Sequence, residues 1–202
     1  TQGVAAVAIG YNAGQENQAS YAVAIGETSG KTNQGSLAVA IGAGSGNSNQ
    51  GFTSVAIGNN AGYSSQGTSA IALGFNAGQT SQLEQTVAIG TNAGQTTQGS
   101  AAVAIGYNAG KTSQGLNSIA IGTSAAQNGQ GNNAVAIGIA SNSTGNSATA
   151  IGASSSAGYE NSTAIGHQAT TTAVNTIQLG NNSVTNVKTN GILNTLISYN
   201  SH

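Results

Sequence analysis

The sequence predicts an all-β fold, a parallel β-solenoid of about twelve coils. The phrase Val103-Ala104-Ile105-Gly106 recurs along the whole chain. Its copies lie sixteen residues apart as far as Ile137 and fourteen residues apart after it. Within each copy, branched and small side chains alternate, which is the period of a strand. A phrase that keeps its phase is typical of stacked coils. The twelve Ile-Gly or Leu-Gly pairs begin at Ile9, Ile25, Ile41, Ile57, Leu73, Ile89, Ile105, Ile121, Ile137, Ile151, Ile165 and Leu179.

The composition excludes several classes of function. Charged residues make up 3% of the 202 residues and the net charge is -1, which gives no electrostatic hold on nucleic acid or on an anionic membrane. Cysteine is absent, so disulfides and thiolate metal sites are excluded. No apolar run approaches the roughly 18 residues of a membrane span. The abundance of Gly, Ser, Thr, Asn and Gln is typical of disorder, but the fixed phase of the repeat favours an ordered solenoid.

The strand of each coil is expected to place Val and Ile inside and Ala outside. Residues such as Val103 and Ile105 point the same way, and Ala104 between them points the opposite way. We assign the branched rows to the interior of the coil. The alanines would then form a small, apolar outer stripe, which favours contact with another surface. The predicted subunit interface comprises Ala24, Ala40, Ala56, Ala72, Ala88, Ala104, Ala120 and Ala136.

The rest of each coil is expected to form corners and a second short strand. Asn108 and Gly110 tolerate positive φ, which favours a turn after the Ile-Gly pair. A glutamine then follows in every sixteen-residue coil. Amides stacked at one position can bond along the axis as a ladder, and a glycan-binding row is the alternative. The predicted ladder comprises Gln18, Gln34, Gln50, Gln66, Gln82, Gln98, Gln114 and Gln130.

Four aromatic residues are candidates for ligand contact. Tyr11, Phe75 and Tyr107 share one outward position of the repeat, and Tyr63 lies at another. Aromatic side chains on a rigid surface suit sugars and protein partners. Unselected variation at exposed corners is the alternative explanation.

The shortening of the repeat predicts two regions. Residues 1–170 form the repeated coils, and residues 171–202 form an adaptor and a C-terminal tail. Because Thr1 stands in the middle of a repeat, we expect a fragment of a longer protein.

The repeated residues resemble the head domain of the YadA-like trimeric autotransporter adhesins. The family repeat appears here as Ser54-Val55-Ala56-Ile57-Gly58-Asn59-Asn60-Ala61, and the resemblance covers about residues 4–187. It implies a left-handed parallel β-roll, three chains side by side as a homotrimer, and heads that bind extracellular matrix or host surfaces. Residues 175–187 look like the neck that ends the roll in this family.

The sequence therefore predicts a non-catalytic adhesin head with multivalent attachment to host, matrix or cell surfaces. No convergent set of ionisable groups that could form an active site can be composed, and we expect no cofactor and no metal. Its partners would be two further copies of the chain and an extracellular protein or glycan, without nucleic acid and without membrane contact by this segment. The expected location is the cell surface, anchored in the outer membrane through a longer protein, or a virion fibre. Two alternatives stay open: a phage, viral or other surface fibre without its own ligand, and an ice-binding solenoid with Thr32, Thr80, Thr96 and Thr112 in one column.

Overall fold

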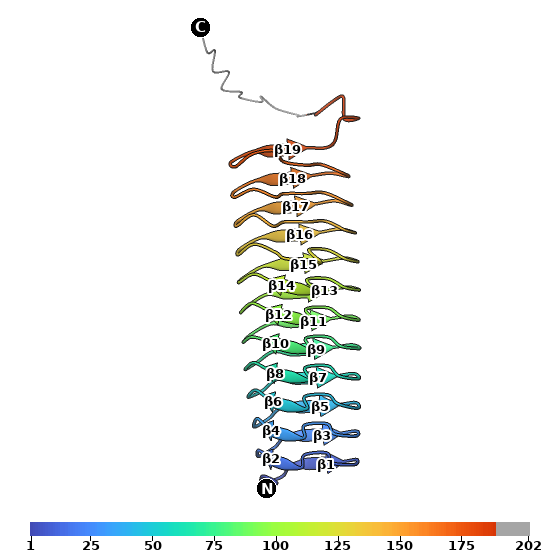
Figure 1. The fold of residues 1–202 in the computed structure, drawn as a ribbon, viewed down its shortest axis with the longest axis vertical. Helices are drawn as coiled ribbons and strands as arrows, with labels where there is room; N and C mark the ends of the chain where they lie inside the picture. The colour runs from blue at the N-terminus through green and yellow to red at the C-terminus, as the bar shows by residue number, and fades with distance from the viewer. Residues whose placement is uncertain (189–202) are drawn as a thin grey trace.

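The computed structural model describes residues 1–188, and within them the fold is a parallel β-solenoid of stacked coils (Figure 1). These residues contain nineteen three-residue strands in two sheets and no helix. The predicted fold class is confirmed. Of the predicted C-terminal region, residues 189–202 lie outside the described part of the chain.

The first sheet runs the length of the rod and has twelve strands in parallel. Neighbouring coils stack in register, so that Ala104 pairs with Ala120 and Ile105 with Ile121. The pairing continues to the last strand, so the stacked coils extend beyond residue 170 to Leu179. The strands are β1 (Val7–Ile9), β3 (Val23–Ile25), β5 (Val39–Ile41), β7 (Val55–Ile57), β9 (Ile71–Leu73), β11 (Val87–Ile89), β13 (Val103–Ile105), β15 (Ile119–Ile121), β16 (Val135–Ile137), β17 (Thr149–Ile151), β18 (Thr163–Ile165) and β19 (Ile177–Leu179).

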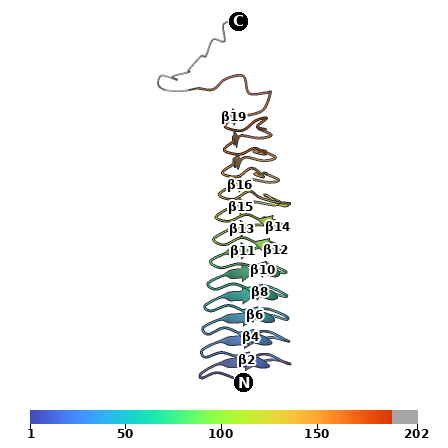
Figure 2. The same cartoon turned by 60° about the vertical axis from the view of Figure 1, so that its left-hand side comes forward.

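The second sheet covers the opposite side of the sixteen-residue coils and has seven strands (Figure 2). Its last strand lies one coil before the repeat shortens, and beyond it isolated bridges such as Thr112–Asn128 and Asn142–Ser156 connect the coils on this side. The first sheet alone continues through the fourteen-residue coils. The strands are β2 (Glu16–Gln18), β4 (Thr32–Gln34), β6 (Ser48–Gln50), β8 (Ser64–Gln66), β10 (Thr80–Gln82), β12 (Thr96–Gln98) and β14 (Thr112–Gln114).

The strands are short because positive-φ residues end them at regular places. Gly106 has φ of 127°, and a Cβ there would lie 2.8 Å from the carbonyl oxygen of Gly122 in the next coil. Asn108, two residues later, has φ of 54°. Asparagine tolerates the left-handed region better than most side chains do. The repeat therefore encodes its corners in the backbone preferences of Gly and Asn.

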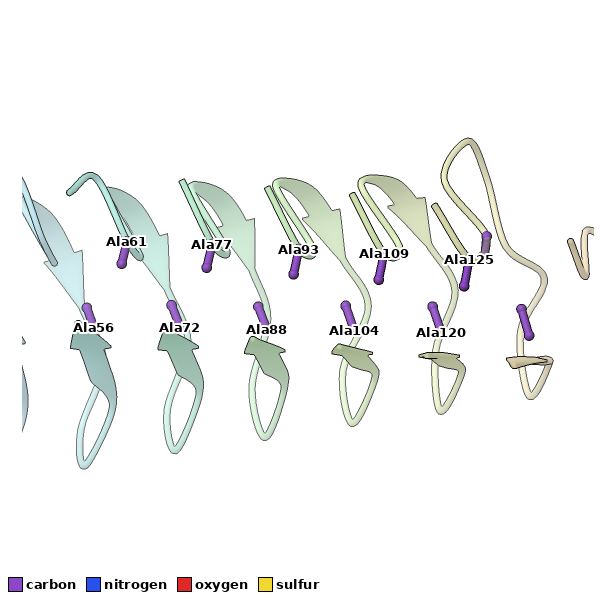
Figure 3. Close-up of a cluster of buried hydrophobic side chains, with 12 residues drawn as sticks. Ala56, Ala61, Ala72, Ala77, Ala88, Ala93, Ala104, Ala109, Ala120 and Ala125 are labelled. Atoms are coloured by element: carbon purple, nitrogen blue, oxygen red, sulfur yellow. The ribbon is translucent and has the colours of Figure 1, made fainter. Parts of the chain in front are cut away.

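The alanines of the first sheet point into the coil and not outward. Ala104 and its equivalents from Ala24 to Ala136 are 0% exposed within the single chain. Figure 3 shows that this row, which includes Ala104, faces a second row of alanines across the coil, which includes Ala109. The prediction that these residues form the subunit interface is wrong, because a side chain with no accessible surface cannot contact another chain. The buried residues that were wrongly predicted to form the interface are Ala24, Ala40, Ala56, Ala72, Ala88, Ala104, Ala120 and Ala136.

The placement of Val and Ile inside the coil is also wrong. Val103 and Ile105 are partly exposed, and Leu73 and Ile165 are 41% and 42% exposed. The physical reason is the narrow space between the two walls of the coil. A Cβ added at Gly110 would lie only 3.3 Å from the Cβ of Ala104. Only a methyl group fits at that position, so the branched side chains are left on the outer surface.

Candidate functional site

The outward side chains of the first sheet form one continuous apolar surface, which we call the Val/Ile face. Successive strands place their branched residues directly above one another, as Val87 and Ile89 lie beside Val103 and Ile105. Exposure of the larger members reaches 73% at Ile177. An apolar stripe of this length on an isolated chain is typical of a surface that binds another protein. The alternating pattern in the sequence identified these rows of branched residues, but the prediction placed them inside the coil and not on its surface.

The outward side of the second sheet forms a polar face. Its central residue in each strand is exposed and has positive φ, with values from 52° to 57°. Asn17 donates to Asn33, and Asn33 donates to Asn49, both at 3.0 Å. This axial amide ladder was missed, because neither its outward direction nor its left-handed backbone is evident from the repeat alone. The central residues are Asn17, Asn33, Asn49, Ser65, Ser81, Thr97 and Ser113.

The glutamines that recur at one position of the sixteen-residue repeat lie inside the solenoid and not on either face. Gln98 is 0% exposed, and its Nε2 donates to the carbonyl oxygens of Val87 at 2.9 Å and Ala102 at 3.1 Å. The side chain thus crosses the coil and fastens the second strand to the first. All eight predicted glutamines make the corresponding bond to a first-sheet carbonyl: Gln18, Gln34, Gln50, Gln66, Gln82, Gln98, Gln114 and Gln130.

The predicted axial ladder of glutamines is present at only two steps. Gln34 donates to Gln50 at 3.1 Å, and Gln82 donates to Gln98 at 3.3 Å. The ladder is therefore a minor feature of this row, and the bond across the coil is the shared one. Burial also contradicts the glycan-binding alternative, because the amides do not reach the surface.

The four aromatic candidates all lie on the surface but not on one face. Tyr11, Phe75 and Tyr107 are 73%, 51% and 55% exposed, and each follows the Ile-Gly or Leu-Gly pair that ends a strand of the first sheet. They therefore border the Val/Ile face. Tyr63 is 40% exposed and directly precedes β8 of the second sheet, with its ring close to Gly44. It is the aromatic candidate beside the polar face.

A shallow hollow of about 420 Å³ lies at the corner that follows β8 and β10. Leu83 lines it together with Ser65, Thr68 and Glu84. Leu83 stands where Gly99 and Gly115 stand in later coils, so the hollow is a local feature of one level of the rod. Among residues 1–188, no group of three or more His, Cys, Asp or Glu side chains is placed to hold a metal ion. No helix capable of spanning a membrane was found in that same part of the chain.

Comparison with known proteins matches the shortened coils to a family. Residues 130–155 and 160–183 match the YadA head domain repeat in two copies. The chain is also similar to the crystal structure of the collagen-binding domain of the Yersinia adhesin YadA, with 26% sequence identity, coverage of 95% of this chain and 89% of that one, and a TM-score of 0.42. No curated protein sequence matches the chain. The two matched segments are YadA-like head repeats, and the longer coils before them carry the same alternating strand phrase that ends in Gly.

Proposed function

We propose that this chain is the non-catalytic head of a surface adhesin, that it acts as a homotrimer, and that its Val/Ile face is the trimer interface. The observation that carries the proposal is the exposure of this face along twelve stacked strands. Burying apolar surface contributes roughly 25 cal/mol per Å². The interior of a single coil contains little more than methyl groups and one glutamine, so the larger apolar side chains stabilise the fold only when another chain covers them.

The trimer interface is tested by a charge placed on either face. Ile105→Glu puts a carboxylate between Ile89 and Ile121 on the Val/Ile face, where desolvation opposes association. Ser113→Glu puts the same group on the polar face. Sedimentation is expected to give monomers for Ile105→Glu and trimers for Ser113→Glu. Trimers from both variants would reject the Val/Ile face as the interface.

With the Val/Ile faces turned inward, the polar face is the outer surface of the trimer and the surface for ligand. It presents small hydroxyls and amides at every level, with Tyr63 at its border. Contacts repeated over three chains and many levels give avidity without a deep pocket. We propose extracellular matrix proteins or glycans as the ligand class.

Binding is tested with immobilised matrix proteins, collagen included, and with a glycan array. Trimers are expected to bind at least one of these surfaces, and monomeric Ile105→Glu to bind far more weakly. Tyr63→Ala should weaken binding while Tyr11→Ala does not. Trimers that bind none of the surfaces would favour the alternative of a structural fibre segment without its own ligand.

The ice-binding alternative is opposed by the threonines themselves. The Oγ1 atoms of Thr80, Thr96 and Thr112 each donate to a backbone carbonyl of the next coil, at 3.2–3.3 Å. Their hydroxyl protons are therefore engaged within the protein. A thermal hysteresis measurement on the trimer decides this alternative. The proposed location is the surface of a cell or of a virion, as part of a longer protein.

A further inference from the structure

Two corners border the Val/Ile face, one on each side. The first corner is the single residue after each Ile-Gly or Leu-Gly pair, such as Tyr107. The second corner is the three residues between the second strand and the buried residue before the next strand, such as 99–101. The chain enters each strand of the first sheet from its second corner and leaves through its first corner. The two corners of one coil therefore lie at opposite edges of the same strand.

Large apolar side chains occur at one of these corners in every coil from β3 to β16, and never at both. All are well exposed in the single chain, from 45% at Leu83 to 63% at Ile139. Two coils depart from this rule. The coil of β1 has a large apolar side chain at both corners, Val4 and Tyr11, and the coil of β17 has none, with Ser147 and Ala153 at its corners. At the second corner they are Tyr21, Leu37, Phe52, Leu83 and Leu116; at the first corner, in the remaining coils, they are Phe75, Tyr107 and Ile139.

The corner opposite each large side chain holds a small or polar residue. In the coil of β13, Tyr107 at the first corner is matched by Ala101 at the second. In the coil of β5 the order is reversed, with Leu37 at the second corner and Ala43 at the first. Within one chain there is no packing reason why a coil should not have large side chains at both corners, because an extended strand separates them. Such a reason exists where the first corner of one copy meets the second corner of another.

We propose that the two corners meet across the seams of the trimer, so that each level of each seam from β3 to β16 is filled by one large apolar side chain packed against one small or polar residue. This proposal rests on the homotrimer proposed above and assigns the contacts at its edges. Parallel chains around a threefold axis bring the first corner of one copy beside the second corner of the next at the same height. Two large residues at one level would overfill the seam, and two small residues would leave a void. Phe75 and Tyr107 are thereby seam residues and not ligand contacts.

The chain contains no cysteine, so paired cysteines report the seam directly. Gln85→Cys with Thr91→Cys places one thiol at each corner of the coil of β11, and Leu83 is retained. The six-residue separation across an extended strand is up to roughly 20 Å, whereas a disulfide requires Cα atoms within roughly 7 Å. The pair can therefore form disulfides only between copies. Under mild oxidation we expect covalently closed trimers on a non-reducing gel.

The control pair is Thr91→Cys with Asn117→Cys, which joins levels two coils apart and adds roughly 10 Å along the axis. It should leave the chains unlinked. If sedimentation shows trimers but the same-level pair does not cross-link, or the control pair cross-links instead, the seam is overturned while the trimer stands. If sedimentation shows monomers for the parent chain, the proposed trimer fails and the seam fails with it.

A swap of side chains tests the packing without thiols. Ala101 has φ of 56°, and Tyr21 occupies the same position of an earlier coil with φ of 61°, so a tyrosine is compatible with this backbone. Tyr107→Ser is expected to raise the concentration at which trimers dissociate by about tenfold, which for a three-chain equilibrium corresponds to about 2.8 kcal/mol per trimer. Adding Ala101→Tyr to that variant should recover most of the loss, because the large side chain returns from the other corner. Equal dissociation of the single and double variants would overturn the proposal.

Discussion

Replacing Ala104 by valine is the sharpest test of which side of the strand is the interior. The Cβ of Ala104 has no exposed surface, and Ala88 and Ala120 flank it in register. On its inner side, a Cβ at Gly110 would already lie 3.3 Å away. The two added methyl groups of valine therefore have no free volume to occupy.

The expected cost of Ala104→Val is at the upper end of the range for overpacked cores, about 3 kcal/mol. For a chain of this size, each kcal/mol lowers the melting temperature by about 2–4 °C, so we expect a decrease of about 6–12 °C. Thermal unfolding followed by circular dichroism measures it. The matched control is Val103→Ile on the adjacent outward position, where Ile71 and Ile119 already occur, and it should change the melting temperature by little.

The reasoning would be refuted by the reverse result. If Ala104→Val melted like the parent chain and Val103→Ile were strongly destabilised, the alanines would face outward and the branched residues inward. A coil that tolerated both changes would indicate a loosely packed interior, which the contacts of Ala104 exclude. Because neighbouring coils share interfaces in a repeat protein, hydrogen exchange should show the loss centred on β11, β13 and β15.

Two further predictions concern the polar groups of the coil. Gln98→Leu keeps the approximate volume but removes the side-chain donor to the carbonyls of Val87 and Ala102. The Ala102 carbonyl keeps its bond from the backbone N–H of Val87, so we expect a loss of about 1–3 kcal/mol in a denaturant titration. Gln95→Leu, on a half-buried side-chain amide that donates to Gln79, should cost less than about 1 kcal/mol, and equal effects would contradict the cross-coil role. Asn33→Ala breaks both steps of the asparagine ladder and places alanine at φ of 54°, with an expected loss of about 1–2 kcal/mol. Asn33→Gly breaks the same bonds without the backbone strain, so it should be the milder variant in the same titration. A glycine variant that is less stable than the alanine variant would contradict the backbone argument.

The repeat by itself determined the fold class, the positions of the strands and the corners. A phrase that returns every sixteen residues with alternating side chains leaves parallel stacking as the arrangement that pairs its backbone groups. Asn108 and Gly110 specify turns through their tolerance of positive φ. These properties are local, or repeat along one direction, and a sequence states both directly.

Only the tertiary structure decided which side of each strand is inside. The alternation shows that Val103 and Ala104 point to opposite faces of the strand, but it does not show which of the two faces is buried. The usual expectation that the larger apolar residues are buried failed, since the distance between the two walls admits only alanine methyls and the amide of a glutamine. The cross-coil bond of Gln98 was hidden for the same reason. It joins residues eleven apart through a space whose width depends on every corner of the coil together.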